Sequence, residues 1–216
     1  MRFPILMLVL IGLPAALADE WPAPVIREVF SNSRAFFVRA IPGKSVGDTV
    51  GFSGAPKGPF ATAEFYRQES DRSYRLAITI TLLNPVAPAE FFVTDRGALI
   101  TLDNWHNRGY GKVVAFYSPE GKPIRAYELS DLFNKGEIDG FEHSVSSIRW
   151  HEFTGSYIRQ GEETFYITVN AAGAGFIFQA TGATYQYCET RGGTYVCRDS
   201  NQNRKWQAYH EPRNVK

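Results

Sequence analysis

Short runs of β-branched and aromatic residues, separated by turns rich in glycine and proline, make up most of this chain. Such runs have the length and side-chain alternation of strands, and frequent turn residues interrupt them too soon for helices. Strands are predicted over residues 35–41, 60–66, 74–83, 91–94, 99–103, 112–117, 124–129, 147–153, 164–170, 175–180 and 183–188. Many short strands with frequent turns predict an all-β fold, with antiparallel sheets in a sandwich, barrel or propeller-like arrangement.

Helical signals are confined to one region between the predicted strands. Ser130 is expected to cap a short turn that runs to Phe133, and a second short turn is expected near residues 137–141. Pro85 and Pro88 exclude a regular helix from the segment that contains them. The predicted fold is therefore all-β with one or two short helical turns.

A faint internal repeat runs along the chain. Three segments each place a turn just before an apolar strand: 33–38, 95–100 and 160–165. Three aromatic strands follow them, at 64–66, 115–121 and 176–182, the last two running on into a further turn. This order resembles successive blades of a β-propeller, with material for about three blades where single-chain propellers typically have at least four. We expect either an incomplete or oligomer-closed propeller, or a series of antiparallel hairpins.

The two cysteines lie in a segment that has the pattern of one hairpin, residues 188–197. Gly192 and Gly193 suit the positive φ angles of a two-residue type I′ turn. Counting outward from this turn pairs Cys188 with Cys197 at a non-hydrogen-bonded position, where opposite Cα atoms lie roughly 4.5 Å apart. This distance suits a disulfide, and the alternative is two free buried thiols. The bond closes a short loop, so it is expected to pin one hairpin rather than the whole fold.

The first residues have the pattern of a cleaved secretory signal. Arg2 precedes an apolar run, and residues 16–18 (Ala-Leu-Ala) provide a small-residue cleavage site. We therefore expect a signal peptide over residues 1–18, a single β-rich domain over 19–200 and a polar C-terminal tail over 201–216. The mature protein is expected to be exported, periplasmic or extracellular, with no transmembrane segment after cleavage.

The charge of the chain is balanced. It has 23 basic and 22 acidic residues, and loss of Arg2 with the signal makes the two numbers equal. A neutral balance provides no broad field for nucleic acid or an anionic membrane, so no nucleic-acid partner is expected. A homo-oligomer stays open as an alternative, because a second copy can close an open sheet edge.

The densest group of polar and aromatic side chains follows the predicted strand at 99–103. Gly109 and Gly111 let the backbone turn before the next apolar run. The candidate binding residues are Asp103, Asn104, Trp105, His106, Asn107, Arg108 and Tyr110. Trp105 and Tyr110 would stack on a sugar or a peptide, while the amides and the guanidinium supply hydrogen bonds.

Two other interpretations of this loop remain open. In a hydrolase or metal-dependent enzyme, Asp103 would orient His106 as a base. Metal binding would need further ligands, drawn from His143, His151, Asp139 or Glu142. The histidine spacing matches no metal motif, so no catalytic residue, metal ligand or cofactor is assigned. In the structural interpretation, Asp103 and Asn104 bond loop amides while Trp105 covers a sheet.

Three segments resemble a pattern found in uncharacterised, exported bacterial proteins rich in β-structure: Thr101-Leu-Asp-Asn-Trp-His106, Gly109-Tyr-Gly111 and His143-Ser-Val-Ser-Ser-Ile148. The resemblance covers about residues 31–197. It implies export and β-structure, and it brings no activity or cofactor. The sequence as a whole predicts a secreted, non-catalytic domain that binds a protein or a glycan through residues 104–110.

Overall fold

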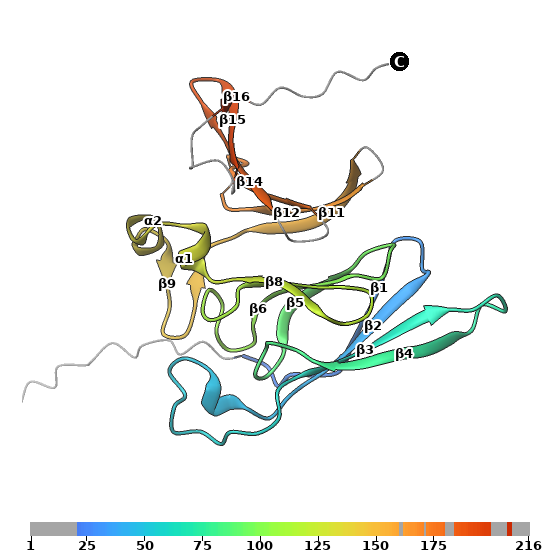
Figure 1. The fold of residues 1–216 in the computed structure, drawn as a ribbon. Helices are drawn as coiled ribbons and strands as arrows, with labels where there is room; N and C mark the ends of the chain where they lie inside the picture. The colour runs from blue at the N-terminus through green and yellow to red at the C-terminus, as the bar shows by residue number, and fades with distance from the viewer. Residues whose placement is uncertain (1–20, 160–161, 171, 180–183, 200–206, 209–216) are drawn as a thin grey trace, which may run out of the picture.

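The structure is a computed structural model, and it describes residues 21–159, 162–170, 172–179, 184–199 and 207–208. The predicted signal peptide lies outside the described residues, as does all of the predicted C-terminal tail except residues 207–208. The fold is all-β, as predicted, and three of its four antiparallel sheets are stacked in layers (Figure 1). No helix in the described part of the chain is long and apolar enough to cross a membrane.

Each large sheet is a meander of strands that are consecutive in the sequence. The N-terminal sheet contains β1 (Arg27–Phe30), β2 (Phe36–Ile41), β3 (Thr62–Gln68) and β4 (Tyr74–Thr81). The middle sheet contains β5 (Pro88–Val93), β6 (Leu99–Asn104), β7 (Val114–Tyr117) and β8 (Pro123–Tyr127). The C-terminal sheet contains β11 (Phe153–Arg159), β12 (Glu162–Thr168), β13 (Gly175–Gln179), β14 (Tyr185–Arg191), β15 (Thr194–Asp199) and β16 (Gln207–Ala208).

Short elements connect these sheets. The 3-10 turn η1 (Val46–Asp48) lies between β2 and β3. The helices α1 (Leu129–Leu132) and α2 (Lys135–Asp139) follow β8 and lead into a small hairpin of β9 (Glu142–His143) and β10 (Ile148–Arg149). This hairpin forms the fourth sheet, and the chain then enters β11.

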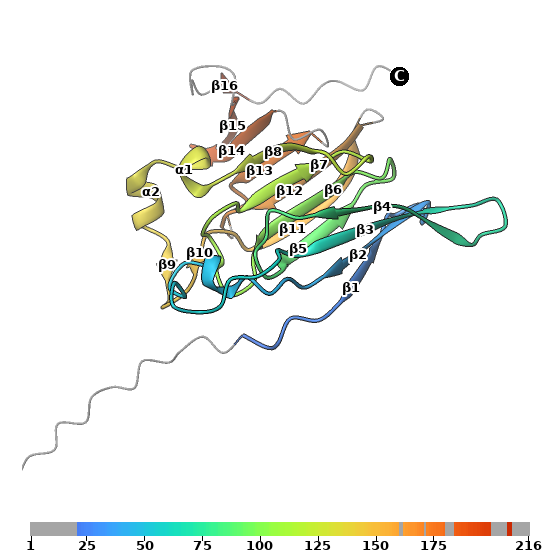
Figure 2. The same ribbon diagram turned by 60° about the horizontal axis from the view of Figure 1, so that its bottom comes forward.

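The middle sheet lies between the other two and is covered on both faces (Figure 2). Every residue of β6 and β7 is buried as a result. One core packs the N-terminal sheet against the middle sheet and includes Val38, Phe65 and Leu99. The other packs the middle sheet against the C-terminal sheet and includes Phe116 and Phe165. Burial of apolar surface in these two layers is the main stabilising contribution.

The predicted internal repeat falls at equivalent places in the three large sheets. Within the described residues, its first set of segments reaches the second strand of each sheet (β2, β6 and β12), and its second set reaches the third strand (β3, β7 and β13). Neighbouring sheets are also linked at these turns. The Ser33 N–H donates to Asp95 Oδ1 at 2.6 Å, and the Asp95 N–H donates to the Glu163 carboxylate at 2.7 Å. Hydrogen bonds therefore link the β1–β2 turn to the β5–β6 turn, and the β5–β6 turn to the start of β12.

Three local predictions are wrong. The strand predicted over 147–153 is present only as β10, because the chain crosses from the small hairpin to the C-terminal sheet and buries Trp150 on the way. Helix α1 begins after Glu128 rather than Ser130, since the Asp131 carboxylate accepts a hydrogen bond from the Glu128 N–H at 2.8 Å. Helix α2 begins after Asn134, earlier than predicted, because the Asn134 side chain accepts from the backbone N–H of the third helical residue.

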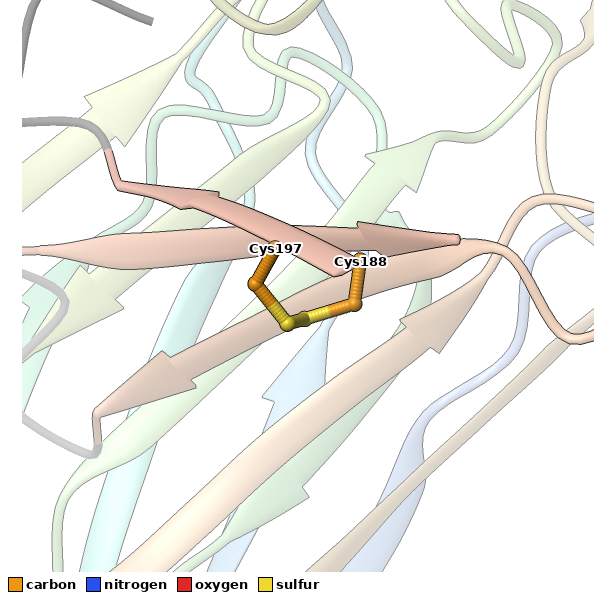
Figure 3. The surroundings of a disulfide bond; sticks show 2 residues. All are labelled: Cys188 and Cys197. Carbon is orange, nitrogen blue, oxygen red and sulfur yellow. A yellow bond between two sulfur atoms is a disulfide. The ribbon is translucent and has the colours of Figure 1, made fainter. Parts of the chain in front are cut away.

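The disulfide prediction is confirmed in both partner and register. Cys188 on β14 and Cys197 on β15 are bonded across the hairpin, with a Cα–Cα distance of 4.1 Å (Figure 3). Gly192 and Gly193 have φ angles of 55° and 80°. These positive values are those of the primed turn that the Gly-Gly pair predicts.

Candidate functional site

Asp103 is the penultimate residue of β6 and the first residue of the predicted site, and its side chain is completely buried. Its Oδ1 accepts hydrogen bonds from the Gly109 N–H at 2.9 Å and from Trp150 Nε1 at 3.0 Å. Its Oδ2 lies 2.9 Å from His151 Nε2 and 3.6 Å from Arg108 Nε. We call Asp103, Arg108, Gly109, Trp150 and His151 the Asp103 cluster.

The Asp103 cluster explains how a carboxylate is tolerated in the interior. A buried charge is costly unless donors surround it, and three hydrogen-bond donors together with the Arg108 guanidinium surround Asp103. The donors come from two segments, the β6–β7 loop and the crossover into the C-terminal sheet. Asp103 therefore joins two segments of the chain. Its backbone φ is 53°, a positive value that aspartate tolerates better than most residues do.

The expected pairing of Asp103 with His106 does not occur. His106 has a φ of 70° in the tight turn that follows β6, and its ring lies against Trp21 and Phe52, with centroids 6.1 and 5.8 Å away. Burial among these rings lowers the pKa of His106. The imidazole that reaches Asp103 belongs to His151, which is itself buried.

The other proposed metal ligands are not brought together. His143 is exposed, and its Nε2 lies 3.1 Å from the Ile138 carbonyl oxygen. Glu142 is paired with Arg149, and Asp139 with Lys135. Within the described residues, no group of three or more His, Cys, Asp or Glu side chains is placed to hold a metal ion.

Asn104 and Asn107 of the predicted site are also buried, and they hold the loop in shape. Asn104 Nδ2 donates to the Tyr110 carbonyl at 2.7 Å, and its Oδ1 accepts from Asn84 Nδ2 at 2.8 Å. Asn107 Nδ2 donates to the carbonyls of Val50 and Ser146 at 2.9 and 3.2 Å. The structural interpretation gave such a bracing role to Asn104, and Asn107, which it did not name, has one as well.

The remaining candidate residues, Trp105, His106, Arg108 and Tyr110, are half-buried. Tyr110 packs against the core between the middle and C-terminal sheets. Trp105 Nε1 donates to the Pro22 carbonyl at 3.0 Å, and its ring lies 5.3 Å from that of Trp21. The segment at residues 21–22 therefore covers part of the loop, and Arg108 is the candidate residue that lines a cavity together with this segment.

This cavity has a volume of about 300 Å³, and we call it the Arg108 pocket. Its wall comes from three separate segments: residues 21–22, Arg108, and the small hairpin with Glu142, Ser144, Ser147 and Arg149. Arg108 pairs with Glu90 at 3.1 Å, and Arg149 pairs with Glu142 at 3.0 Å. The Ser147 Oγ is buried and has no hydrogen-bond partner among the described residues.

Sequence reasoning missed Trp21, Arg149 and the two serines of this pocket. The run 143–148 was named in the resemblance and for His143, but its pairing as a hairpin beside the β6–β7 loop depends on distant contacts. One such contact is the hydrogen bond from the Ile148 N–H to the Arg108 carbonyl at 2.9 Å. No signal in the local sequence indicates this bond.

Comparisons with known proteins add no further assignment. No protein-family model matches this chain, and no curated protein or solved structure matches it significantly. The functional argument therefore depends on the site itself.

Proposed function

We propose that this protein is an exported, non-catalytic binding domain that holds one sugar unit of a glycan in the Arg108 pocket. The observation that carries the proposal is that two arginines, Arg108 and Arg149, line one cavity together with Trp21. The buried Ser147 hydroxyl in the same wall has hydrogen-bonding capacity that no described residue uses.

The chemistry of the wall suits a sugar better than a purely apolar ligand. A sugar ring carries hydroxyls that both donate and accept, and the pocket offers donors from two arginines, an acceptor from Glu142 and two serine hydroxyls. The Trp21 indole supplies an apolar surface of the kind that packs against a sugar ring at low entropic cost. The volume of about 300 Å³ lies at the lower end of the range for ligand pockets, which favours a single ring.

The carboxylates favour binding over glycoside hydrolysis. Hydrolysis of a glycosidic bond generally uses two carboxyl groups that flank the bond. Among the described residues that line the pocket, Glu142 is the one carboxylate, and it is ion-paired with Arg149. The Asp103–His151 pair is buried, so its geometry supports the loop rather than a reaction.

The test is a glycan panel with the wild-type protein, followed by calorimetry on each hit with two variants. Arg149→Ala removes a pocket guanidinium whose side chain is 68% exposed, so folding is expected to be unchanged. Arg75→Ala is the matched control, because Arg75 is 67% exposed and also pairs with a glutamate. We expect Arg149→Ala to weaken binding by about tenfold or more and Arg75→Ala to leave it unchanged.

Two results would contradict the proposal. One is the absence of any glycan hit with folded protein, including the case in which a peptide binds instead. The other is glycan binding that both variants retain in full, which would place the ligand outside the Arg108 pocket.

A further inference from the structure

The β4 strand is a long, open sheet edge. It is the last strand of the N-terminal sheet and pairs only with β3. Residues 75–79 and Thr81 are exposed, including Leu76 at 44% and Ile78 at 36%. Its sequence, YRLAITIT, contains no proline and one charged residue, Arg75, which pairs with Glu69 at 2.6 Å. A long edge of this composition is a template for pairing with another strand.

The other edge strands in the described part of the chain are blunted or engaged. Two edge strands, β1 and β11, contact β5 of the middle sheet. Arg27 on β1 donates to the Ala89 carbonyl of β5 at 2.9 Å, and Thr154 on β11 donates to the Glu90 carboxylate of β5 at 2.8 Å. The edge strand β8 begins with a proline and carries Arg125, and β16 has two residues. Among the edge strands whose burial is described along their whole length, β4 is the one that combines length, exposure and low charge.

The position of β4 leaves this edge accessible. The β3–β4 hairpin extends beyond the other two large sheets in both views (Figures 1 and 2). The turn at Gly121 lies against the side chains of Ile78 and Ile80, in the second half of the strand. A bulge opposite Tyr66 bends β4, but the strand continues through all eight residues.

We infer that β4 is a self-association surface, at which two copies of this chain pair antiparallel and join their N-terminal sheets. The four strands of each copy would then form one continuous sheet across a two-fold axis. Such an axis uses the same strand on both copies, and it is the commonest symmetry of soluble oligomers. The inference is independent of the Arg108 pocket, whose lining residues lie outside β4.

The composition of β4 favours a second copy as its partner. An antiparallel axis through Ile78 places Arg75 of one copy opposite Thr81 of the other, so the two arginines lie at opposite ends of the pair. No like charges face each other, and the central residues Ile78 and Thr79 have high strand propensity. Two copies of β4 can therefore pair without charge repulsion between their strands.

The test is the molar mass of the protein over a concentration series, measured by sedimentation equilibrium. We expect the mass to rise toward twice that of one chain for the wild type. Leu76→Lys introduces a charge on β4, and Ile124→Lys is the matched control on β8, where Ile124 is 43% exposed. Leu76→Lys is expected to keep the protein monomeric at concentrations where Ile124→Lys still dimerises, with circular dichroism verifying that both are folded.

Hydrogen exchange provides an independent readout. Amides of residues 74–81 should exchange more slowly as concentration rises, while amides of β8 should not change. A mass of one chain at every concentration up to the solubility limit would overturn the inference. A dimer that Leu76→Lys leaves intact, with no added protection on β4, would overturn it as well, because the interface would then lie elsewhere.

Discussion

The indole of Trp150 donates a hydrogen bond to the carboxylate of Asp103, although 47 residues separate the two in the sequence. The bond connects the end of β6 to the crossover that enters the C-terminal sheet. Because both side chains are buried, this contact and the neighbouring His151 contact determine how the β6–β7 loop is held.

Replacing Asp103 is expected to be strongly destabilising. Asp103→Ala leaves the buried Trp150 and His151 donors without their acceptor, and each unsatisfied buried donor costs about 1–3 kcal/mol of the free energy of unfolding. Asp139→Ala is the control, because Asp139 forms an exposed ion pair with Lys135, and it should change stability by less than about 1 kcal/mol. Urea unfolding measures both. Equal, small effects would show that the Asp103 cluster does not hold the loop.

His106 is expected to make stability depend on pH. Burial lowers its pKa in the folded protein below the ordinary value of 6.5. As pH falls below 6.5, the unfolded chain takes up a proton that the folded protein binds less readily, so stability is lost down to the folded pKa. His106→Gln should flatten this part of the stability profile, as measured by denaturation at several pH values. If the stability of His106→Gln falls with pH as steeply as that of the wild type, other groups cause the pH dependence.

Asp95 links the turns of the N-terminal and middle sheets. Its carboxylate accepts from the Ser33 N–H, and this bond lowers the pKa of Asp95. Asp95→Ala should reduce stability by about 1 kcal/mol at neutral pH, a modest value because the contact is exposed. The loss should shrink as the pH is lowered through the folded pKa of Asp95, since protonation weakens the same bond in the wild type. A thermal series across acidic pH tests both features.

The disulfide is expected to stabilise one hairpin. The two cysteines have a sequence separation of 9, for which the chain-entropy relation gives about 2.5 kcal/mol of stabilisation by the Cys188–Cys197 bond. A double Cys→Ser variant should therefore stay folded, with faster hydrogen exchange confined to β14 and β15. Faster exchange throughout the middle sheet would mean that the bond supports the whole fold.

Local features of this fold could be predicted from the sequence, and distant contacts could not. The register of β14 and β15 follows from the Gly192-Gly193 turn, because a two-residue turn determines every pair beside it. The partner of Asp103 does not follow from spacing, since His151 lies 48 residues away while His106 is three residues away. The polar loop was located correctly, but the burial of Asn104 and Asn107 depends on their contacts with Asn84 and Val50.

The short strand β1 could not be predicted from sequence patterns either. Its four residues, REVF, place two charges beside two apolar side chains, and a run this short carries little periodic signal. It becomes a strand because it pairs with β2 along its whole length. The Arg108 pocket was missed for a related reason, since its wall joins three segments that no local pattern connects.

The order of the sheets in the stack is also their order along the chain, and this has a consequence for folding. Most strand pairs are between sequence neighbours, so each meander can form from local contacts before the next one is present. The N-terminal and middle sheets can pack first, but the face of the middle sheet with Val114 and Phe116 stays bare until β11–β14 arrive. That interval is when the newly made chain is most prone to aggregate, and the stage at which a chaperone would have most to protect.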